Sequence, residues 1–204
     1  MSAAESADAK IIPLDLPFKG SRQYLHGTDI FNAVISLMRP QHGVAIRLHR
    51  VMRHPIDLLP ADNLPRTSDD SAGSYSQFEA DGSKRIWLFC ENRSRQVMRR
   101  IPYDENDIVA DAVHRDGQIM SPGPSNYTFI ERIVALHKAM LRSRSDLGGT
   151  GAWLFTHLDV TRVPWHPGRL ELKLASALGT TMVKSVISCD GATIGHIAFW
   201  SVKE

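Results

Sequence analysis

The sequence of 204 residues is short of cysteine, of long apolar runs and of net charge. It has no stretch of 18 apolar residues, which excludes a typical membrane-spanning helix. Its 24 basic and 22 acidic side chains leave a formal charge of +2, so nothing indicates binding to nucleic acid or to a membrane. The opening residues MSAAESADAK lack the basic and apolar regions of a secretory signal. We therefore expect a cytoplasmic protein.

The two cysteines, Cys90 and Cys189, both lie in apolar stretches typical of strands. We expect two thiols, and a disulfide between them stays open as an alternative. There is no C-x-x-C or H-x-x-x-H spacing to build a zinc site. His49 and His54 are five residues apart, which places them on opposite faces of a strand. The sequence therefore predicts no metal and no cofactor.

The C-terminal part shows the clearest pattern, a series of strands. RLELKLASAL alternates leucine with charged residues, as a half-buried strand does. Asp190-Gly191 between two β-branched runs is typical of a tight type I′ hairpin. We predict an antiparallel meander of four strands at residues 152–163, 169–178, 181–189 and 192–202.

Two segments are predicted to be helices. Residues 125–144 repeat apolar side chains at helical spacing, with Ser125 or Asn126 as the cap and an arginine-rich last turn. Residues 28–38, TDIFNAVISLM, are apolar on nearly all sides. A helix of that composition has to be largely buried.

The order of predicted elements is similar in the two halves of the chain: a short strand, a buried helix, then antiparallel strands. FEADGSKRIWLFCEN and ISCDGATIGHIAFWS both place an Asp-Gly turn before an aromatic strand. We therefore predict a duplication, with a flexible tail at 1–18, an N-terminal half at 19–100 and a C-terminal half at 101–204. The Pro/Asp/Ser-rich residues 53–73 are predicted to form a long surface loop.

Residues 126–202 resemble the hotdog superfamily, in its thioesterase and dehydratase branches. The resemblance lies in the helix IERIVALHKAML, the strand WLFTHLDVTRVPW, the Pro-Gly step in HPGRLELKLASAL and the final Asp-Gly hairpin. It implies an α+β fold in which a curved antiparallel sheet wraps around a central helix. Applied to both halves, it implies a double hotdog in one chain.

The resemblance also implies a function. Hotdog proteins mostly bind acyl thioesters of coenzyme A or of an acyl carrier protein, and backbone N–H groups at the N-terminus of a helix polarise the thioester carbonyl. A carboxylate or histidine then acts as a base. The dehydratase pattern is matched only in part, because Glu131 follows Pro122-Gly123 by eight residues, which is too late for that motif.

The candidate site residues cluster at the two predicted helix starts. As catalytic residues we select His26, Asp29 and Glu131, and as substrate-binding residues Gly27, Thr28, Asn126 and Tyr127. Five of them have a structural alternative: Thr28, Asp29 and Asn126 as helix caps, His26 as a core histidine and Glu131 as a solvated side chain. His137 lies on the apolar helix face and is predicted to be a core histidine. Four arginines, Arg93, Arg95, Arg99 and Arg100, fit either a solvated loop or a grip on coenzyme A phosphates.

Taken together, the sequence predicts a protein that binds an acyl thioester of coenzyme A or acyl carrier protein, with thioesterase or dehydratase chemistry at the helix N-termini. We expect a homodimer. The first alternative is a non-catalytic acyl-binding protein or oligomeric scaffold with the same fold. The second is a ligand-binding β-barrel unrelated to thioesters.

Overall fold

The computed structural model describes residues 11–63, 71–144 and 152–202. Before residue 102 the elements are β1 (Ile12–Leu14), β2 (Phe18–Lys19), α1 (Gly27–Met38), β3 (Val44–Leu48), β4 (Ile56–Pro60), the 3-10 turn η1 (Ala61–Asn63), β5 (Ser71–Phe78), β6 (Lys84–Glu91) and β7 (Arg100–Ile101). After it come η2 (Asp107–Val109), β8 (Val113–Arg115), β9 (Gln118–Ser121), α2 (Phe129–Arg142), β10 (Ala152–Val160), β11 (Leu170–Leu178), β12 (Met182–Cys189) and β13 (Ala192–Val202).

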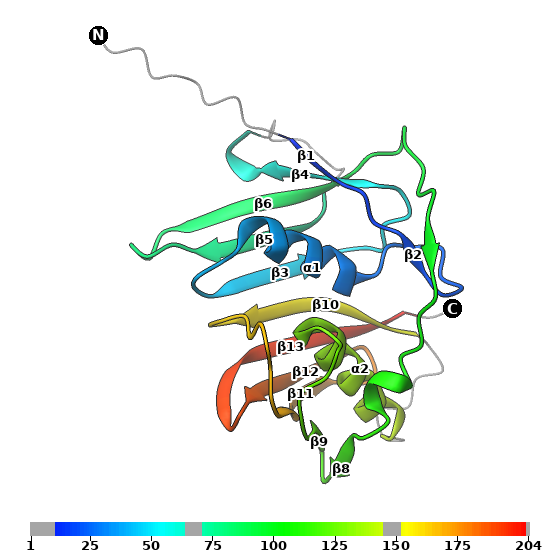
Figure 1. Ribbon diagram of the computed structural model, residues 1–204, viewed down its shortest axis with the longest axis vertical. Helices are drawn as coiled ribbons and strands as arrows, with labels where there is room; N and C mark the ends of the chain where they lie inside the picture. The colour runs from blue at the N-terminus through cyan, green and yellow to red at the C-terminus, as the bar shows by residue number, and fades with distance from the viewer. Residues whose placement is uncertain (1–10, 64–70, 145–151, 203–204) are drawn as a thin grey trace.

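One antiparallel sheet runs through the whole described chain (Figure 1). Its eleven strands lie in the order β1-β4-β6-β5-β3-β10-β13-β12-β11-β9-β8. The two halves of the chain join at the seam between β3 and β10, where residues 44–47 pair with residues 157–160. A short parallel pair, β2 with β7, stands apart from this sheet.

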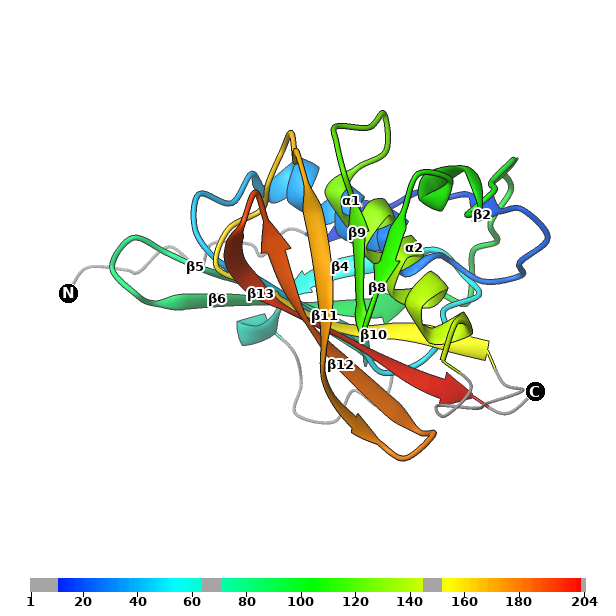
Figure 2. The same ribbon diagram turned by 90° about the horizontal axis from the view of Figure 1, so that it is seen from below.

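Both helices lie on the same side of the sheet (Figure 2). In each half a curved set of strands wraps around one helix, α1 in the first and α2 in the second. The fold is therefore the expected α+β hotdog architecture, present twice in one chain. Among the described helices, none is long and apolar enough to cross a membrane.

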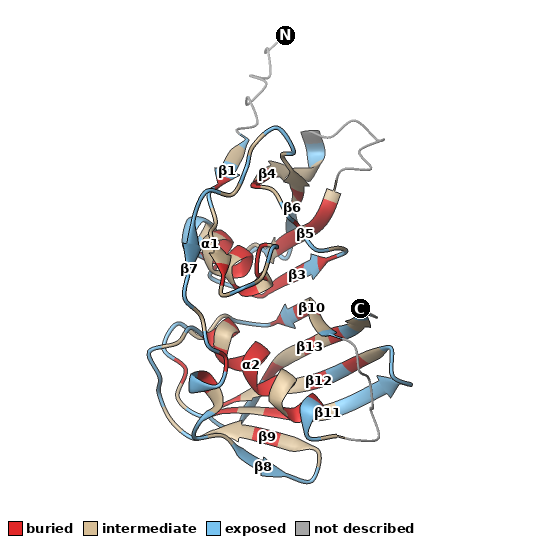
Figure 3. Cartoon of the chain, turned by 90° about the vertical axis from the view of Figure 1, so that its right-hand side faces the viewer, coloured by how far each residue is buried: buried red, intermediate tan, exposed pale blue. Residues whose placement is uncertain are grey.

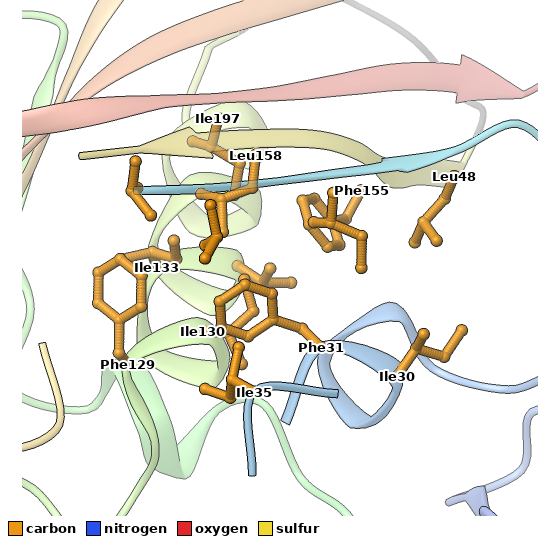
Figure 4. Packing of buried hydrophobic residues seen from close by; sticks show 14 of the residues in the cluster. Ile30, Phe31, Ile35, Leu48, Phe129, Ile130, Ile133, Phe155, Leu158 and Ile197 are labelled. Atoms are coloured by element: carbon orange, nitrogen blue, oxygen red, sulfur yellow. The ribbon is translucent and has the colours of Figure 1, made fainter. Parts of the chain in front are cut away.

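The core lies between the helices and the strands that they cover (Figure 3). Phe31 and Ile35 of α1 lie beside Ile130 of α2, and the seam strand β10 covers them with Phe155 and Leu158 (Figure 4). Phe31, Ile130 and Leu158 are fully buried. The apolar character of α1 on nearly all sides follows from this position, because α2 and the sheet both pack against it.

The two halves are not exact copies of each other. In the second half β11, β12 and β13 follow one another as neighbours in the sheet. In the first half β6 lies between β4 and β5, so the chain has to cross from β4 to a strand that is not its neighbour. This crossover uses part of the segment that was predicted to be a surface loop.

Several sequence predictions need correction. Residues 56–60 form β4 rather than loop, and Ile12–Leu14 of the predicted flexible tail pair with β4 as β1. The short strand expected before the first helix is not formed, because residues 22–26 are irregular. The seam strand β10 pairs with β13, not β11, so the meander contains only β11, β12 and β13. Residues 1–10 and 64–70 lie outside the described residues. The division of the chain at residue 100 stays a prediction.

Other predictions are confirmed. Asp190 and Gly191 have φ values of 51° and 84°, as a type I′ turn requires. Cys90 and Cys189 are not joined in a disulfide; Cys189 is buried, but Cys90 is only half-buried. The side chain of His137 is fully buried, and its Nε2 lies 3.0 Å from the Ser185 hydroxyl, as expected for a core histidine with a partner.

Candidate active site

The N-terminus of α1 forms one wall of a cavity of about 360 Å³. Apolar side chains from both halves of the chain supply most of the other walls. The first half contributes the segment before α1 and the end of β3, and the second contributes α2, β10 and β13. The lining residues that matter below are His26, Gly27, Thr28, Leu48, Val51, Met52, Val134, Lys138, Leu154, Phe155, Thr156 and Trp200.

The first turn of α1 is open toward this cavity. His26 is the N-cap residue, but its side chain accepts no hydrogen bond from the helix. The expectation that Thr28 or Asp29 caps α1 is therefore wrong. A Cβ at Gly27 would lie 2.8 Å from the side chains of Leu48 and Phe155. Glycine thus lets the start of the helix approach these apolar side chains closely, and Gly27 and Thr28 both line the cavity.

His26 links the cavity wall to a buried carboxylate. Its Nδ1 lies 2.6 Å from the Thr28 hydroxyl, and its Nε2 lies 3.5 Å from Oε1 of Glu105. Glu105 also contacts three cations: Lys138 at 2.7 Å, Arg22 at 3.0 Å and Arg142 at 3.4 Å. His26, Thr28 and Glu105 are all buried.

This environment sets the charge of both groups. Burial lowers the pKa of His26 to about 4, so the ring is neutral at pH 7. Burial acts to raise the pKa of Glu105, but the hydrogen bond with His26 and the cations Lys138 and Arg22 outweigh it and hold that pKa far below its usual range. The ionised Glu105 accepts hydrogen bonds only, so the proton of the His26 ring belongs on Nε2 and Nδ1 accepts from the Thr28 hydroxyl.

A second buried ionic cluster lies between the two helix starts. Nζ of Lys19 is 2.7 Å from Asp29 and 2.8 Å from Glu131, and it stands 4.4 Å from the centre of the Tyr103 ring. Lys19 is only 3% exposed. Neither Asp29 nor Glu131 lines the cavity. The structure thus places these two predicted catalytic carboxylates in an ion cluster beside the site rather than in it.

The start of α2 is closed. Thr128 is its N-cap, and with Glu131 it forms a complete capping box. The amide of Asn32 also donates to the Thr128 hydroxyl at 3.1 Å. Asn126 and Tyr127 precede the helix, Asn126 on the exposed surface, and neither lines the cavity at α1. The predictions that Ser125 or Asn126 caps this helix, and that Glu131 is simply solvated, are both wrong.

Of the seven predicted site residues, the structure brings His26, Gly27 and Thr28 together at the cavity. The sequence reading missed Glu105, Lys138 and Lys19. The sequence indicates Lys138 only weakly: it lies beside His137 on a predicted helix whose other face is apolar. Glu105 lies in an irregular segment and Lys19 in the two-residue strand β2, and neither gave a signal in the sequence.

The remaining candidates do not form a site. Arg99 contacts Asp15, Arg100 donates to the Gly20 carbonyl, and Arg95 contacts Asp57. These arginines therefore make contacts within the chain, and none of them lines the cavity. Within the described ranges, no group of three or more His, Cys, Asp or Glu side chains is placed to hold a metal ion.

No protein-family model matches the sequence, and no curated protein matches it. Solved structures do resemble the chain. The 12:0-ACP thioesterase from Umbellularia californica aligns over 95% of this chain and 96% of its own, with 6% identity and a TM-score of 0.47. The dehydratase domain of PpsC from Mycobacterium tuberculosis, in complex with C12:1-CoA, aligns over 88% and 85%, with 10% identity and a TM-score of 0.48.

A conserved protein with a hot dog fold from Alicyclobacillus acidocaldarius aligns over 89% of both chains, with 9% identity and a TM-score of 0.44. Likenesses at these identities and TM-scores carry no functional argument. The assignment of this chain to the hotdog fold follows from its own strand order and from the two helices that its sheet wraps.

Proposed function

We propose that the chain binds an acyl thioester in the cavity at α1, with the acyl chain among the apolar walls and the thioester carbonyl at the helix N-terminus. The observation that carries this proposal is the open first turn of α1 in the wall of an apolar cavity. The volume of about 360 Å³ lies within the range of roughly 300–1,000 Å³ for small-molecule sites. The substrate class follows from the hotdog resemblance of the sequence.

The proposed reaction is hydrolysis. Thr28, His26 and Glu105 follow one another as hydroxyl, imidazole and carboxylate, the order that activates a nucleophile. In the first step the Thr28 oxygen attacks the thioester carbonyl carbon while its proton passes to Nδ1 of His26. Glu105 stabilises the imidazolium that forms, and the N–H groups of the first turn of α1 stabilise the oxyanion.

The second step releases the product. The carbon–sulfur bond breaks, the leaving thiolate takes the proton from His26, and the acyl group stays on Thr28 as an ester. A water molecule then attacks the ester, with His26 again accepting a proton. The ester C–O bond breaks, the Thr28 oxygen takes the proton back from His26 to restore the hydroxyl, and the free acid leaves.

The positions and charge of the carboxylates favour hydrolysis over dehydration. Dehydration requires a second group that donates a proton to the departing hydroxyl. Asp29 and Glu131 are held by Lys19 outside the cavity lining, and Glu105 is ionised. No protonated carboxyl group among the described residues therefore faces the cavity.

Binding is tested with one pair of variants. Val51 lines the cavity and is 36% exposed, whereas Val113 on β8 is 39% exposed and lies elsewhere. We expect decanoyl-CoA to bind the native chain and Val113→Trp equally in isothermal titration calorimetry, and Val51→Trp at least about 10-fold more weakly. Equal binding by all three proteins would place the ligand outside this cavity.

Catalysis is tested at Thr28. Thr28→Ser keeps the hydroxyl and should hydrolyse decanoyl-CoA, whereas Thr28→Val should lose about 10²–10⁴-fold in kcat. Intact mass spectrometry of the native chain should show a transient gain of one decanoyl group, absent in Thr28→Val. Binding without turnover in the native chain would instead support the non-catalytic acyl-binding alternative.

A further inference from the structure

A second cavity of about 610 Å³ lies on the convex face of the sheet, opposite the helices. It crosses the seam between the two halves, because its walls come from β3, β10, β12 and β13. Its two cationic side chains alternate with buried residues along their strands: Arg47 is exposed between Ile46 and Leu48, and Lys184 is exposed between Val183 and Ser185. We call this cavity the convex groove.

The convex groove is cationic and has one aromatic wall. Arg47 and Lys184 both carry positive charge, and Asp159 is the one acidic residue among the described residues that line it. His157 and His196 add ring nitrogens. Burial and the neighbouring Arg47 lower the pKa of His157, so this ring is a neutral hydrogen-bonding group at pH 7. These charges and rings favour binding of an anion that carries several hydrogen-bond acceptors.

Trp200 supplies the aromatic wall. Its side chain is 51% exposed, which leaves an indole face open to a flat partner. Base–aromatic stacking stabilises a bound nucleobase without requiring a particular base. A cationic groove with an exposed indole therefore fits a nucleotide better than it fits a purely apolar partner.

The convex groove adjoins the acyl cavity. Leu48, His49, Thr156 and Trp200 line both. β3 and β10 pair only through residues 44–47 and 157–160, and β10 has a bulge at Thr156. β3 ends at Leu48, so residues 152–156 of β10 have no partner in β3, and the two cavities meet beside this unpaired stretch. One ligand with an apolar end and a polyanionic end would reach both.

We propose that the convex groove binds the phosphorylated adenosine diphosphate of coenzyme A, with Arg47 and Lys184 on the phosphates and the adenine stacked on Trp200. This inference rests on the proposed function and narrows its substrate class to coenzyme A thioesters, since the arm of a carrier protein has no nucleotide. The pantetheine arm then passes the residues that line both cavities, beside the unpaired part of β10, toward the N-terminus of α1.

The first test uses the nucleotide alone. Adenosine 3′,5′-bisphosphate should bind the native chain in isothermal titration calorimetry, more weakly as salt is raised. Arg47→Ala/Lys184→Ala should weaken this binding at least about 10-fold. The control Arg85→Ala/Lys173→Ala removes the same charge from exposed positions outside the convex groove and should leave it unchanged. All four side chains are exposed, and equal melting temperatures should show that both variants fold.

The second test separates the two proposals. Decanoyl-CoA carries the nucleotide and decanoyl-pantetheine does not. For Arg47→Ala/Lys184→Ala, kcat/KM should fall at least about 10-fold with decanoyl-CoA and stay unchanged with decanoyl-pantetheine. If neither thioester binds the native chain while the nucleotide does, the proposed function fails and the convex groove stands as a nucleotide site. No nucleotide binding, or binding that the double variant leaves unchanged, overturns the inference.

Discussion

At the scale of single residues, two buried ionic clusters hold the site together. Lys19 pairs with both Asp29 and Glu131 between the helix starts, and Glu105 pairs with Arg22, Lys138 and Arg142 behind His26. Buried charges of this kind are stable only while they are paired, because their desolvation is costly.

The first prediction concerns Lys19. Lys19→Met should destabilise the fold by about 3–5 kcal/mol, because it leaves two buried carboxylates close together without a counter-charge. Urea denaturation of the variant and of the exposed control Lys84→Met measures the difference. Adding Asp29→Asn to Lys19→Met should restore part of the loss. A cost for Lys19→Met no larger than that of Lys84→Met would show that the cluster does not stabilise the fold.

This cluster also shows what the sequence cannot predict. Lys19 and Glu131 are 112 positions apart in the chain, and a contact over that separation leaves no local pattern. The sequence reading did select His26, Gly27 and Thr28, because a polar stretch that turns into an apolar helix is a local feature. It selected Asp29 and Glu131 for the same reason, but their long-range partner Lys19 holds both carboxylates outside the lining of the cavity.

The second prediction concerns pH. The pKa of His26 falls from an unfolded value of 6.5 to about 4 in the folded chain. The unfolded chain therefore binds the proton first as the pH drops, and the folded state loses about 3 kcal/mol between pH 6.5 and 4. The fully buried His137, with a pKa lowered by burial to about 3, acts in the same direction.

Urea denaturation across this range measures the effect. His26→Asn should remove part of the loss, whereas His42→Asn at an exposed position should leave it unchanged. The same slope in His26→Asn and the native chain would contradict the buried, neutral state of His26.

At the scale of elements, periodicity predicted the helices and the C-terminal strands well. The apolar character of α1, the alternation of β11 and the Asp190-Gly191 turn are all local signals. The helix caps and β4 were missed. Thr128 caps α2 through a reciprocal bond with Glu131, although Ser125 and Asn126 precede it in sequence. β4 lies in a Pro-rich segment whose strand character comes from pairing with β1 and β6.

The third prediction concerns Arg132, which links α2 to the neighbouring connections. Arg132 is 1% exposed and donates to the carbonyl oxygens of Pro167 and Gly168 and to the Ser121 hydroxyl, at 2.8 to 2.9 Å. It therefore fixes the β10–β11 connection and the end of β9 against the helix. Arg132→Met should cost about 3 kcal/mol, because buried acceptors lose their donor. Arg169→Met removes an exposed arginine and is the control in the same denaturation experiment. Similar costs for the two variants would contradict this role of Arg132.

At the scale of the whole molecule, the two halves depend on each other. The cavity at α1 has walls from both, the β3–β10 seam joins their strands, and both ionic clusters cross between them. The resemblance of the sequence predicted the architecture but not the changed strand order of the first half. The predicted homodimer stays a prediction, which light scattering of the purified chain would test.

The fourth prediction concerns cooperativity. The two halves share one hydrophobic core and both ionic clusters across the β3–β10 seam. The full chain should therefore unfold in one transition, with circular dichroism and tryptophan fluorescence giving the same midpoint. A fragment of residues 101–204 should not fold alone, since it loses Lys19, Arg22 and His26 as partners of its buried carboxylates. Two separate transitions, or a folded fragment, would show that the halves are independent.

The central claim is that an acyl chain enters the cavity beside the open N-terminus of α1. The most direct measurement is photocrosslinking with a thioether analogue of decanoyl-CoA that carries a diazirine at the end of its acyl chain, followed by mapping of the labelled residues by mass spectrometry. We predict labelling of the cavity walls at Val134, Leu154 and Phe155, competed by decanoyl-CoA. Competed labelling confined to residues outside the cavity would contradict the claim.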